Sequence, residues 1–328
     1  MTTLLDTHYH YDFLPPQART AFLHEIAEEG VEIVAQTLTP SGFLALETEE
    51  KNRVEASSSG SDPRDSTSPR LSVGFHPWSI GPDYQRELDI FAQALTRTRF
   101  VGEVGLDYFP RRLQQVPAET QAEVFRSILD ILSSQRTDGP YVLSIHAVRS
   151  ASQVCDALEA TDTSGMVPIF HRFGGSSDEL TRLIKQGGYI SVNPAMLSTK
   201  RGRAYVTQVP ADRLLLETDL PERTEAGDNL GKNHAGELIE TLNATVNTIA
   251  TLRHQDWENS LPTPCALLSN CTEHDPQAVS TTLINEVDTH IRRGDDDGEI
   301  RDHTRTGRTP GEPGAHLHEP GRTRTSFQ

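Results

Sequence analysis

Residues 101–107 read VGEVGLD, residues 118–134 read AETQAEVFRSILDILSS and residues 141–147 read YVLSIHA. The first and third segments are short and mainly apolar, which is typical of parallel strands that are covered on both faces. The segment between them repeats apolar side chains at the three- and four-residue spacing of one helix face. The three segments therefore predict a strand, a helix and a second strand parallel to the first.

The same alternation extends in both directions along the chain. Eight strands are predicted, at residues 4–8, 32–37, 71–76, 101–107, 141–147, 167–173, 189–193 and 214–219. Helices are predicted at residues 16–29, 85–97, 118–134, 151–159, 177–185 and 232–252. This pattern favours an α/β protein with a single (β/α)8 TIM barrel, and an open doubly wound sheet is the alternative.

Two polar stretches depart from this pattern. Residues 47–69, ETEEKNRVEASSSGSDPRDSTSP, hold few large apolar side chains, so we expect a disordered insert there. Residues 288–328 are rich in Gly, Pro, Arg, Asp and His without periodicity, and we expect a disordered polar tail. The barrel domain is accordingly expected to span residues 1–287.

The formal net charge of -17 opposes general electrostatic attraction to nucleic acid, so any contact with DNA must be local. The three cysteines, Cys155, Cys265 and Cys271, contain no Cys-X-X-Cys pair and predict a reducing compartment. No apolar run is long enough to cross a membrane. We expect a cytoplasmic location, with the nucleus as the alternative, and no membrane contact.

Ionisable side chains stand at the carboxyl ends of most predicted strands, where TIM barrels keep their chemistry. The candidate metal ligands are four histidines and two carboxylates: His8, His10, Glu103, His146, His171 and Asp219. His8 and His10 are two residues apart, so both imidazoles point to one side of a strand. Any one of these residues alone is more often hydrogen-bonded or ion-paired than bound to metal. Their convergence indicates a metal site, because buried charges must be paired or coordinate metals.

The types of ligand also narrow the choice of metal ion. Imidazole and carboxylate without thiolate suit Zn or Mn, and Mg is the alternative. Six candidates are more than one catalytic ion with an open position requires. Two divalent ions about 3.5–4 Å apart, bridged by one carboxylate, would use them all and are common in phosphoester hydrolysis.

Six motifs, in this order, resemble those of the TatD family of metal-dependent deoxyribonucleases, within the amidohydrolase-like barrel group. They are DTHYH at residues 6–10, GFHPW at 74–78, GEVGLDY at 102–108, SIHAVR at 144–149, FHRFGG at 170–175 and ETDLP at 217–221. The resemblance implies a TIM-barrel hydrolase that cleaves phosphodiester bonds in DNA. By the same resemblance, one ion is held by His8, His10 and Asp219, the other by His146 and His171, and Glu103 bridges both.

The resemblance also implies catalytic roles for Glu103 and for Asp219, which would accept the proton of the attacking water. Asp6 and Glu217 are expected to orient ligands rather than to bind the ions. The expected substrate contacts are His76, Arg149 and Arg172. Arg149 stands one residue further from His146 than the arginine of many family members, and Arg172 adds a cation where the family commonly has cysteine.

Two other functions stay open. The same barrel could hydrolyse a small amide, lactone or phosphoester, because the fold does not fix the substrate. Alternatively, a metal-stabilised barrel could act mainly as a protein-binding partner through its flexible tail. In favour of DNA, basic residues follow several strands and predict a small basic rim: Arg111, Arg112, Lys200, Arg201, Arg203 and Arg223. Several aromatic residues near strand ends, Trp78 and Phe109 among them, are candidates for stacking on bases.

Overall fold

The structure is a computed structural model that describes residues 4–57, 68–135, 139–222 and 230–255 of the chain. The strands are β1 Leu4–Tyr9, β2 Val31–Ala35, β3 Arg70–Leu71, β4 Val73–Phe75, β5 Phe100–Asp107, β6 Tyr141–Val148, β7 Met166–His171, β8 Tyr189–Val192 and β9 Leu214–Leu216. All the strand pairs are parallel, in the order β3-β2-β1-β9-β8-β7-β6-β5-β4.

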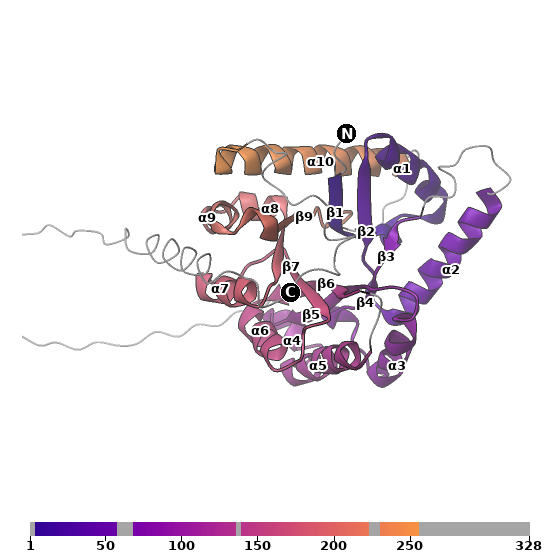
Figure 1. Cartoon of the computed structure of the whole chain (residues 1–328). Helices are drawn as coiled ribbons and strands as arrows, with labels where there is room; N and C mark the ends of the chain where they lie inside the picture. The colour runs from indigo at the N-terminus through magenta and orange to yellow at the C-terminus, as the bar shows by residue number, and fades with distance from the viewer. Residues whose placement is uncertain (1–3, 58–67, 136–138, 223–229, 256–328) are drawn as a thin grey trace, which may run out of the picture.

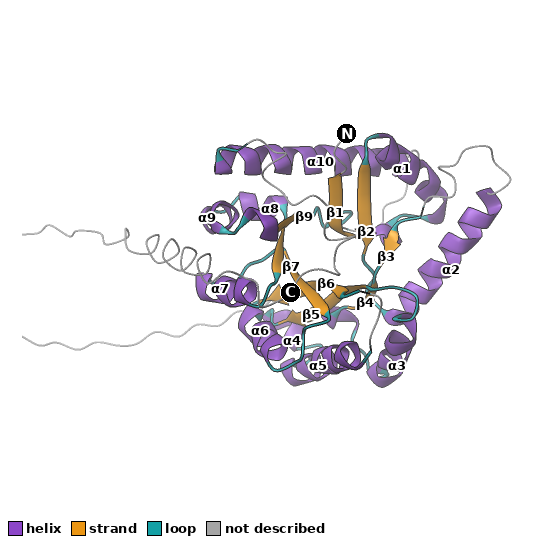
Figure 2. Cartoon of the chain, in the orientation of Figure 1, coloured by secondary structure: helices purple, strands orange, loops and turns teal. Residues whose placement is uncertain are grey.

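Helices surround these strands (Figures 1 and 2). The α-helices are α1 Pro16–Glu28, α2 Pro40–Ser57, α3 Tyr84–Ala94, α4 Pro110–Leu113, α5 Ala118–Ser134, α6 Ala151–Glu159, α7 Ser177–Lys185, α8 Pro194–Leu197, α9 Lys200–Gln208 and α10 Leu230–Arg253. Short 3-10 helices lie at η1 Tyr11–Phe13, η3 Pro77–Ser79 and η4 Ala211–Arg213. A strand usually precedes a helix that returns along the outside, as a parallel barrel requires.

The third predicted strand closes the barrel by dividing into two. β3 pairs with β2, and β4, which starts after Ser72 alone, pairs with β5 at the other end of the strand order. Ser72 N donates to Ala35 O at 2.9 Å, and Glu103 N donates to Thr37 O at 3.1 Å, so β2 and β5 approach each other at this point. The predicted TIM barrel is therefore confirmed, and the alternative of an open sheet is wrong.

Closure needs a residue without a side chain at Gly74. A Cβ atom there would lie 1.7 Å from the carbonyl oxygen of Thr37 and 2.7 Å from the backbone nitrogen of Glu103. Thr37 Oγ1 instead accepts a hydrogen bond from Gly74 N at 3.0 Å. The glycine of the GFHPW motif thus lets three backbone segments meet where the barrel closes.

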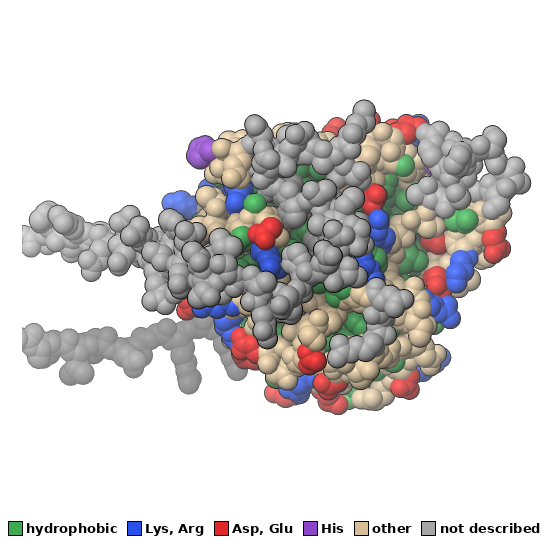
Figure 3. All heavy atoms as spheres, viewed as in Figure 1, with side chains coloured by type: hydrophobic (Ala, Val, Ile, Leu, Met, Phe, Trp, Pro, Cys, Tyr) green, Lys and Arg blue, Asp and Glu red, His purple; other side chains and the backbone are tan. Residues whose placement is uncertain are grey.

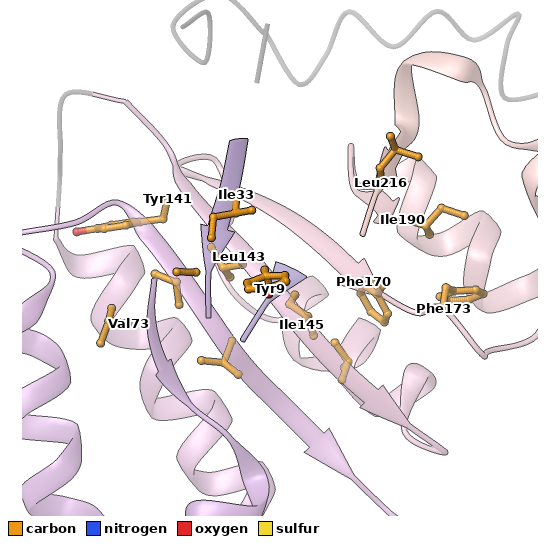
Figure 4. Packing of buried hydrophobic residues seen from close by; sticks show 14 of the residues in the cluster. Tyr9, Ile33, Val73, Tyr141, Leu143, Ile145, Phe170, Phe173, Ile190 and Leu216 are labelled. Atoms are coloured by element: carbon orange, nitrogen blue, oxygen red, sulfur yellow. The ribbon is translucent and has the colours of Figure 1, made fainter. Parts of the chain in front are cut away.

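Two apolar clusters lie on the two faces of the strands. Leu5, Val34, Phe100, Val142, Ile169 and Leu215 form a small cluster contributed by six strands. Only the inside of a barrel brings six strands together, so this cluster fills the interior. The larger cluster lies between strands and helices, and Figure 4 shows part of it, with Ile33, Leu143 and Phe170 extending from β2, β6 and β7.

The prediction of a disordered insert at residues 47–69 is wrong for residues 47–57. Helix α2 runs from Pro40 to Ser57, and it buries Phe43 and Leu46 in the larger apolar cluster. One turn further, the carboxylate of Glu50 accepts a hydrogen bond from the hydroxyl of the buried Tyr11 at 2.9 Å. Most of the polar side chains at residues 47–56 lie on the outer face of this helix, whereas Glu50 is buried. Residues 58–67, the predicted tail at 288–328 and the predicted domain boundary at residue 287 lie outside the described residues.

The surface carries both signs of charge. On the face in Figure 3, Asp and Glu side chains lie among Lys and Arg side chains, with neither forming a large patch of its own. No helix in the described part of the chain is long and apolar enough to cross a membrane.

Candidate metal centre

The carboxyl ends of the strands bring the six predicted ligands into one cluster. His8 lies on β1, Glu103 on β5, His146 on β6 and His171 on β7. The other two follow strands, His10 directly after β1 and Asp219 three residues after β9. All are buried except Asp219, whose side chain is 22 % exposed. The cluster is thus shielded from water but open at Asp219.

Glu103 lies at the centre of this cluster, with one carboxylate oxygen facing each pair of histidines. Its Oε2 atom is 3.6 Å from His8 Nε2 and 3.8 Å from His10 Nε2. Its Oε1 atom is 2.6 Å from His146 Nδ1 and 2.8 Å from His171 Nε2. A carboxylate placed in this way can serve two cations at once.

On the first side, Asp219 completes a group of donors with the spacing that a metal ion needs. Asp219 Oδ1 is 3.3 Å from His10 Nε2 and 3.6 Å from His8 Nε2. Ligands of a tetrahedral zinc ion, with bonds of about 2.0–2.1 Å, lie about 3.3–3.4 Å apart. Among the described residues, the buried Nε2 of His8 has no hydrogen-bond partner, which is unusual for a buried ring nitrogen and suits a metal ligand. These residues therefore fit a divalent ion.

On the second side, His76 joins His146 and His171. Its Nε2 atom is 3.4 Å from Glu103 Oε1, and its Nδ1 atom accepts a hydrogen bond from Trp78 N at 3.0 Å. The sequence suggested His76 as a substrate contact, but its side chain is buried inside the cluster. This placement groups it with Glu103 and His146 as a third possible donor.

Two polar side chains hold the outer nitrogens of predicted ligands. Ser144 Oγ lies 2.7 Å from His8 Nδ1, and Asp107 Oδ2 lies 3.2 Å from His146 Nε2. Such contacts fix the ring orientation and the tautomer of a histidine that binds a metal. Neither residue is among the predicted ligands or substrate contacts, although Asp107 is one of the ionisable side chains at the end of a predicted strand. Ser144 stands two residues before His146 on one strand, so the strand period could have placed both side chains on the same face.

Asp6 and Glu217, the expected orienting residues, brace the strands that carry the ligands. Asp6 accepts hydrogen bonds from His8 N at 2.9 Å and from the hydroxyl of Thr218 at 2.5 Å, and so joins β1 to the end of β9. Burial raises the pKa of Asp6 to about 8. Glu217 Oε1 lies 3.7 Å from His171 Nδ1.

The electrostatics of the cluster favour ionised carboxylates. Burial alone would raise the pKa of Glu103, but His76, His171 and the other histidines outweigh it and hold that pKa well below its usual range. Burial would also raise the pKa of Asp219, but the hydrogen bond from His10 and the nearby histidines outweigh it and lower that pKa. A buried anion, Glu103, and a partly exposed one, Asp219, thus lie among imidazoles in a site that suits divalent cations.

The two arginines predicted as substrate contacts lie at the edge of the cluster. Arg172 Nη1 is 3.4 Å from Asp219 Oδ2, and 55 % of the Arg172 side chain is exposed. Arg149 lies further out, with its Cζ atom 5.1 Å from the centre of the Phe109 ring. Arg149, Arg172 and Asp219 all have positive φ angles, of 56°, 48° and 63°. Residues other than glycine rarely adopt this conformation, and such residues cluster at functional sites.

Comparison with known proteins identifies TatD-type deoxyribonucleases as similar proteins. The family described as "TatD related DNase" matches residues 5–261. The "Deoxyribonuclease Tat-D" of Schizosaccharomyces pombe is 33% identical over 166 residues, which are 46% of this chain and 50% of that protein. The "Putative deoxyribonuclease TATDN1 homolog" of Encephalitozoon cuniculi is 33% identical over 187 residues, which are 57% of this chain and 62% of that protein.

Solved structures support the fold. The crystal structure of the TatD homologue YJJV from Escherichia coli superposes with a TM-score of 0.57 at 21% identity, covering 88% of this chain and 95% of that chain. The sequence matches cover less of the relatives than the structural matches do. The chain spans between 42% and 62% of the length of the first three curated relatives.

Proposed function

Because the chain belongs to the family of TatD-related deoxyribonucleases, we propose that it hydrolyses phosphodiester bonds in DNA with the help of two divalent metal ions. One observation carries this proposal, namely the position of Glu103 between His8 and His10 on one side and His146 and His171 on the other. A carboxylate between two sets of donors suits two metal ions, which are common in phosphoester hydrolysis.

We assign the ions as the family motifs suggest. His8, His10 and Asp219 would hold one ion, His146 and His171 would hold the other, and Glu103 would contribute a ligand to both. His76 is close enough to Glu103 to support the second position. The donors are imidazole and carboxylate groups without thiolate, so Zn and Mn are the preferred metals and Mg is the alternative.

When bound, such ions activate a water molecule and neutralise charge on the phosphate. The protein supplies the proton acceptor. Asp219 is ionised at neutral pH, because its pKa is held below its usual value, and its side chain is partly exposed. Its Oδ1 faces His10, whereas Oδ2 faces Arg172. Asp219 Oδ2 can take the proton of the attacking water, while the exposed guanidinium of Arg172 contacts a phosphate oxygen.

A metal and activity measurement on one preparation tests the proposal. The full-length protein is expected to contain bound divalent metal and to cleave single- or double-stranded DNA when loaded with Mn, Zn or Mg. Glu103→Ala is expected to lose bound metal and cleavage together. Lys185→Ala serves as a control, because Lys185 is exposed on the last turn of α7, at the opposite end of the barrel.

The proposal fails if the metal-loaded protein never cleaves DNA and Glu103→Ala keeps its metal. If metal is lost with Glu103 but DNA is not cleaved, the same samples are assayed with small phosphoesters, amides and lactones. Turnover of one of these would make the protein a small-molecule hydrolase with the same metal centre.

We also propose a location for the protein and a role for its C-terminal residues. The protein is expected in the cytoplasm, and residues 288–328 are expected to contact a protein partner. Truncation after residue 287 followed by capture and cleavage assays separates the tail from the metal centre. Capture that depends on the tail while cleavage does not would support a partner role for this segment.

A further inference from the structure

The exposed large hydrophobic side chains of the described residues gather beside the metal centre. They are Trp78, which is 50% exposed, Phe109, which is 45% exposed, and Val148, which is 36% exposed. Trp78 lies in η3 directly after β4, Phe109 follows β5, and Val148 is the last residue of β6. These three strands are consecutive in the barrel. Exposed apolar surface that is confined to one edge of an active-site face indicates a binding surface.

A guanidinium group lies over each of the two aromatic rings. The Cζ atom of Arg112 is 3.5 Å from the centre of the Trp78 ring, and that of Arg149 is 5.1 Å from the centre of the Phe109 ring. These four residues, Trp78, Phe109, Arg112 and Arg149, form what we call the aromatic rim. Aromatic rings can stack on nucleobases and arginines can pair with phosphates. The rim thus combines both parts of a nucleotide-binding surface.

One carboxylate connects the rim to the metal centre. Trp78 Nε1 donates a hydrogen bond to Asp107 Oδ2 at 2.6 Å, and Phe109 N donates one to Asp107 Oδ1 at 2.8 Å. Asp107 Oδ2 is also 3.2 Å from Nε2 of the predicted ligand His146. The same carboxylate therefore holds both aromatic residues and a ligand. The ring centres of Trp78 and His146 are 6.3 Å apart, so a base on the rim would lie close to a phosphate of the same DNA strand at the metal centre.

We propose that the aromatic rim binds an unpaired nucleobase of the DNA strand whose backbone is cleaved at the metal centre. This inference rests on the proposed function for the role of the strand, but not for the binding itself. An unpaired base is favoured because the faces of a paired base are covered by its neighbours in the duplex. Two arginines on a chain with a net charge of -17 also favour an anionic polymer at this edge.

Binding can be measured without cleavage by following tryptophan fluorescence in the presence of EDTA. The chain has two tryptophans, so in the Trp257→Phe variant of the full-length protein the signal comes from Trp78 alone. The two probes are a short oligothymidylate and an abasic oligomer with the same number of phosphates. We expect the oligothymidylate to quench Trp78 and the abasic oligomer to leave its fluorescence unchanged.

Variants then separate stacking from charge, with fluorescence anisotropy of labelled oligomers as the readout. Trp78→Ala is expected to weaken oligothymidylate binding roughly 5- to 100-fold, the range for loss of one stacked base, and to leave binding of the abasic oligomer unchanged. Trp78→Phe keeps a ring and should retain most of this affinity. Arg112→Ala is expected to weaken both probes, whereas Lys185→Ala, which removes one charge at the other end of the barrel, should weaken neither.

The inference is overturned if Trp78→Ala and Phe109→Ala bind both probes like the parent protein, with circular dichroism showing that they are folded. Cleavage is measured separately, so the two proposals can fail independently. If DNA is cleaved but neither substitution alters base-dependent binding, the proposal that the rim binds a base is wrong and the proposed function stands. If base-dependent quenching occurs but DNA is never cleaved, the rim stands and the proposed function is wrong.

Discussion

The contact between Asp107 and His146 offers a direct test of the proposed second ion position. Asp107 receives three donors, because Trp78 Nε1 and His146 Nε2 face its Oδ2 atom and Phe109 N faces its Oδ1 atom. The substitution Asp107→Asn keeps the shape of the side chain but replaces one oxygen by an NH2 group. Whichever way the amide turns, the negative charge is lost and the NH2 group faces at least one donor, so His146 Nε2 meets either a neutral oxygen or an NH2 group.

The size of the effect follows from these contacts. Burial alone would raise the pKa of Asp107, but the hydrogen bonds from His146, Phe109 and Trp78 lower it, so the carboxylate is ionised. Loss of a hydrogen bond to a charged group costs about 1.5–3 kcal/mol. Loss of the outer partner of a metal-bound histidine lowers metal affinity by about 10- to 100-fold. The two ranges correspond to roughly the same free energy. Asp107→Asn is therefore expected to lower the affinity for the second ion about 10- to 100-fold.

The assay is a calorimetric titration of the metal-free protein with Mn or Zn. The parent protein is expected to show two binding events, and Asp107→Asn should weaken one of them. Ser144→Ala is the reciprocal variant, because Ser144 contacts His8 at the first ion position. It should weaken the other event, and the double variant should weaken both.

Circular dichroism of the metal-free variants shows whether they are folded. The reasoning is refuted if folded Asp107→Asn binds two ions with the affinities of the parent protein. It is also refuted if Asp107→Asn and Ser144→Ala weaken the same binding event, because the two contacts would then not belong to different ions.

Three further predictions concern stability and reactivity. Gly74→Ala forces a Cβ atom to 1.7 Å from a backbone oxygen, so it should lower the free energy of unfolding by about 3 kcal/mol or more, as measured by urea denaturation. The control Gly236→Ala, in an open position on α10, should be neutral or stabilising. Removal of metal by EDTA should lower Tm by roughly 5–10 °C for each ion that was present at about a hundred times its Kd, as measured by differential scanning fluorimetry. Burial raises the pKa of the Cys155 thiol to about 11, so at pH 8, with the other two cysteines replaced by serine, a thiol reagent should label it roughly 100-fold more slowly than the unfolded chain. Equal labelling rates, or a Tm that does not respond to EDTA, would contradict these expectations.

The elements that sequence reasoning found and missed differ in how their apolar residues are spaced. Helix α5 was predicted with its correct bounds, because its buried residues repeat over many turns. Helix α2 was not predicted, because after Leu46 the sequence is rich in charge and the helix is stabilised by packing against the barrel. Local composition therefore indicated an insert where long-range contacts stabilise a helix.

The candidate site shows the same division. The spacing of His8 and His10 predicted that both side chains lie close together, and their ring centres are 5.1 Å apart. The hydrogen bond between Trp78 and Asp107 could not be predicted, because it joins residues 29 positions apart. No local pattern encodes such a pair.

The sequence by itself determined the alternation of strands and helices, and with it the residues that stand at the carboxyl ends of strands. It did so because the period of a strand or helix is a local property of the chain. Only the tertiary structure decided which ends are neighbours. The pairing of β1 with β9 places Asp219 N within 3.1 Å of His8 O, across 211 residues, and the packing of the strands turns the two oxygens of Glu103 toward different histidines. These distances depend on how all the strands pack around a shared interior, which no single segment of the sequence specifies.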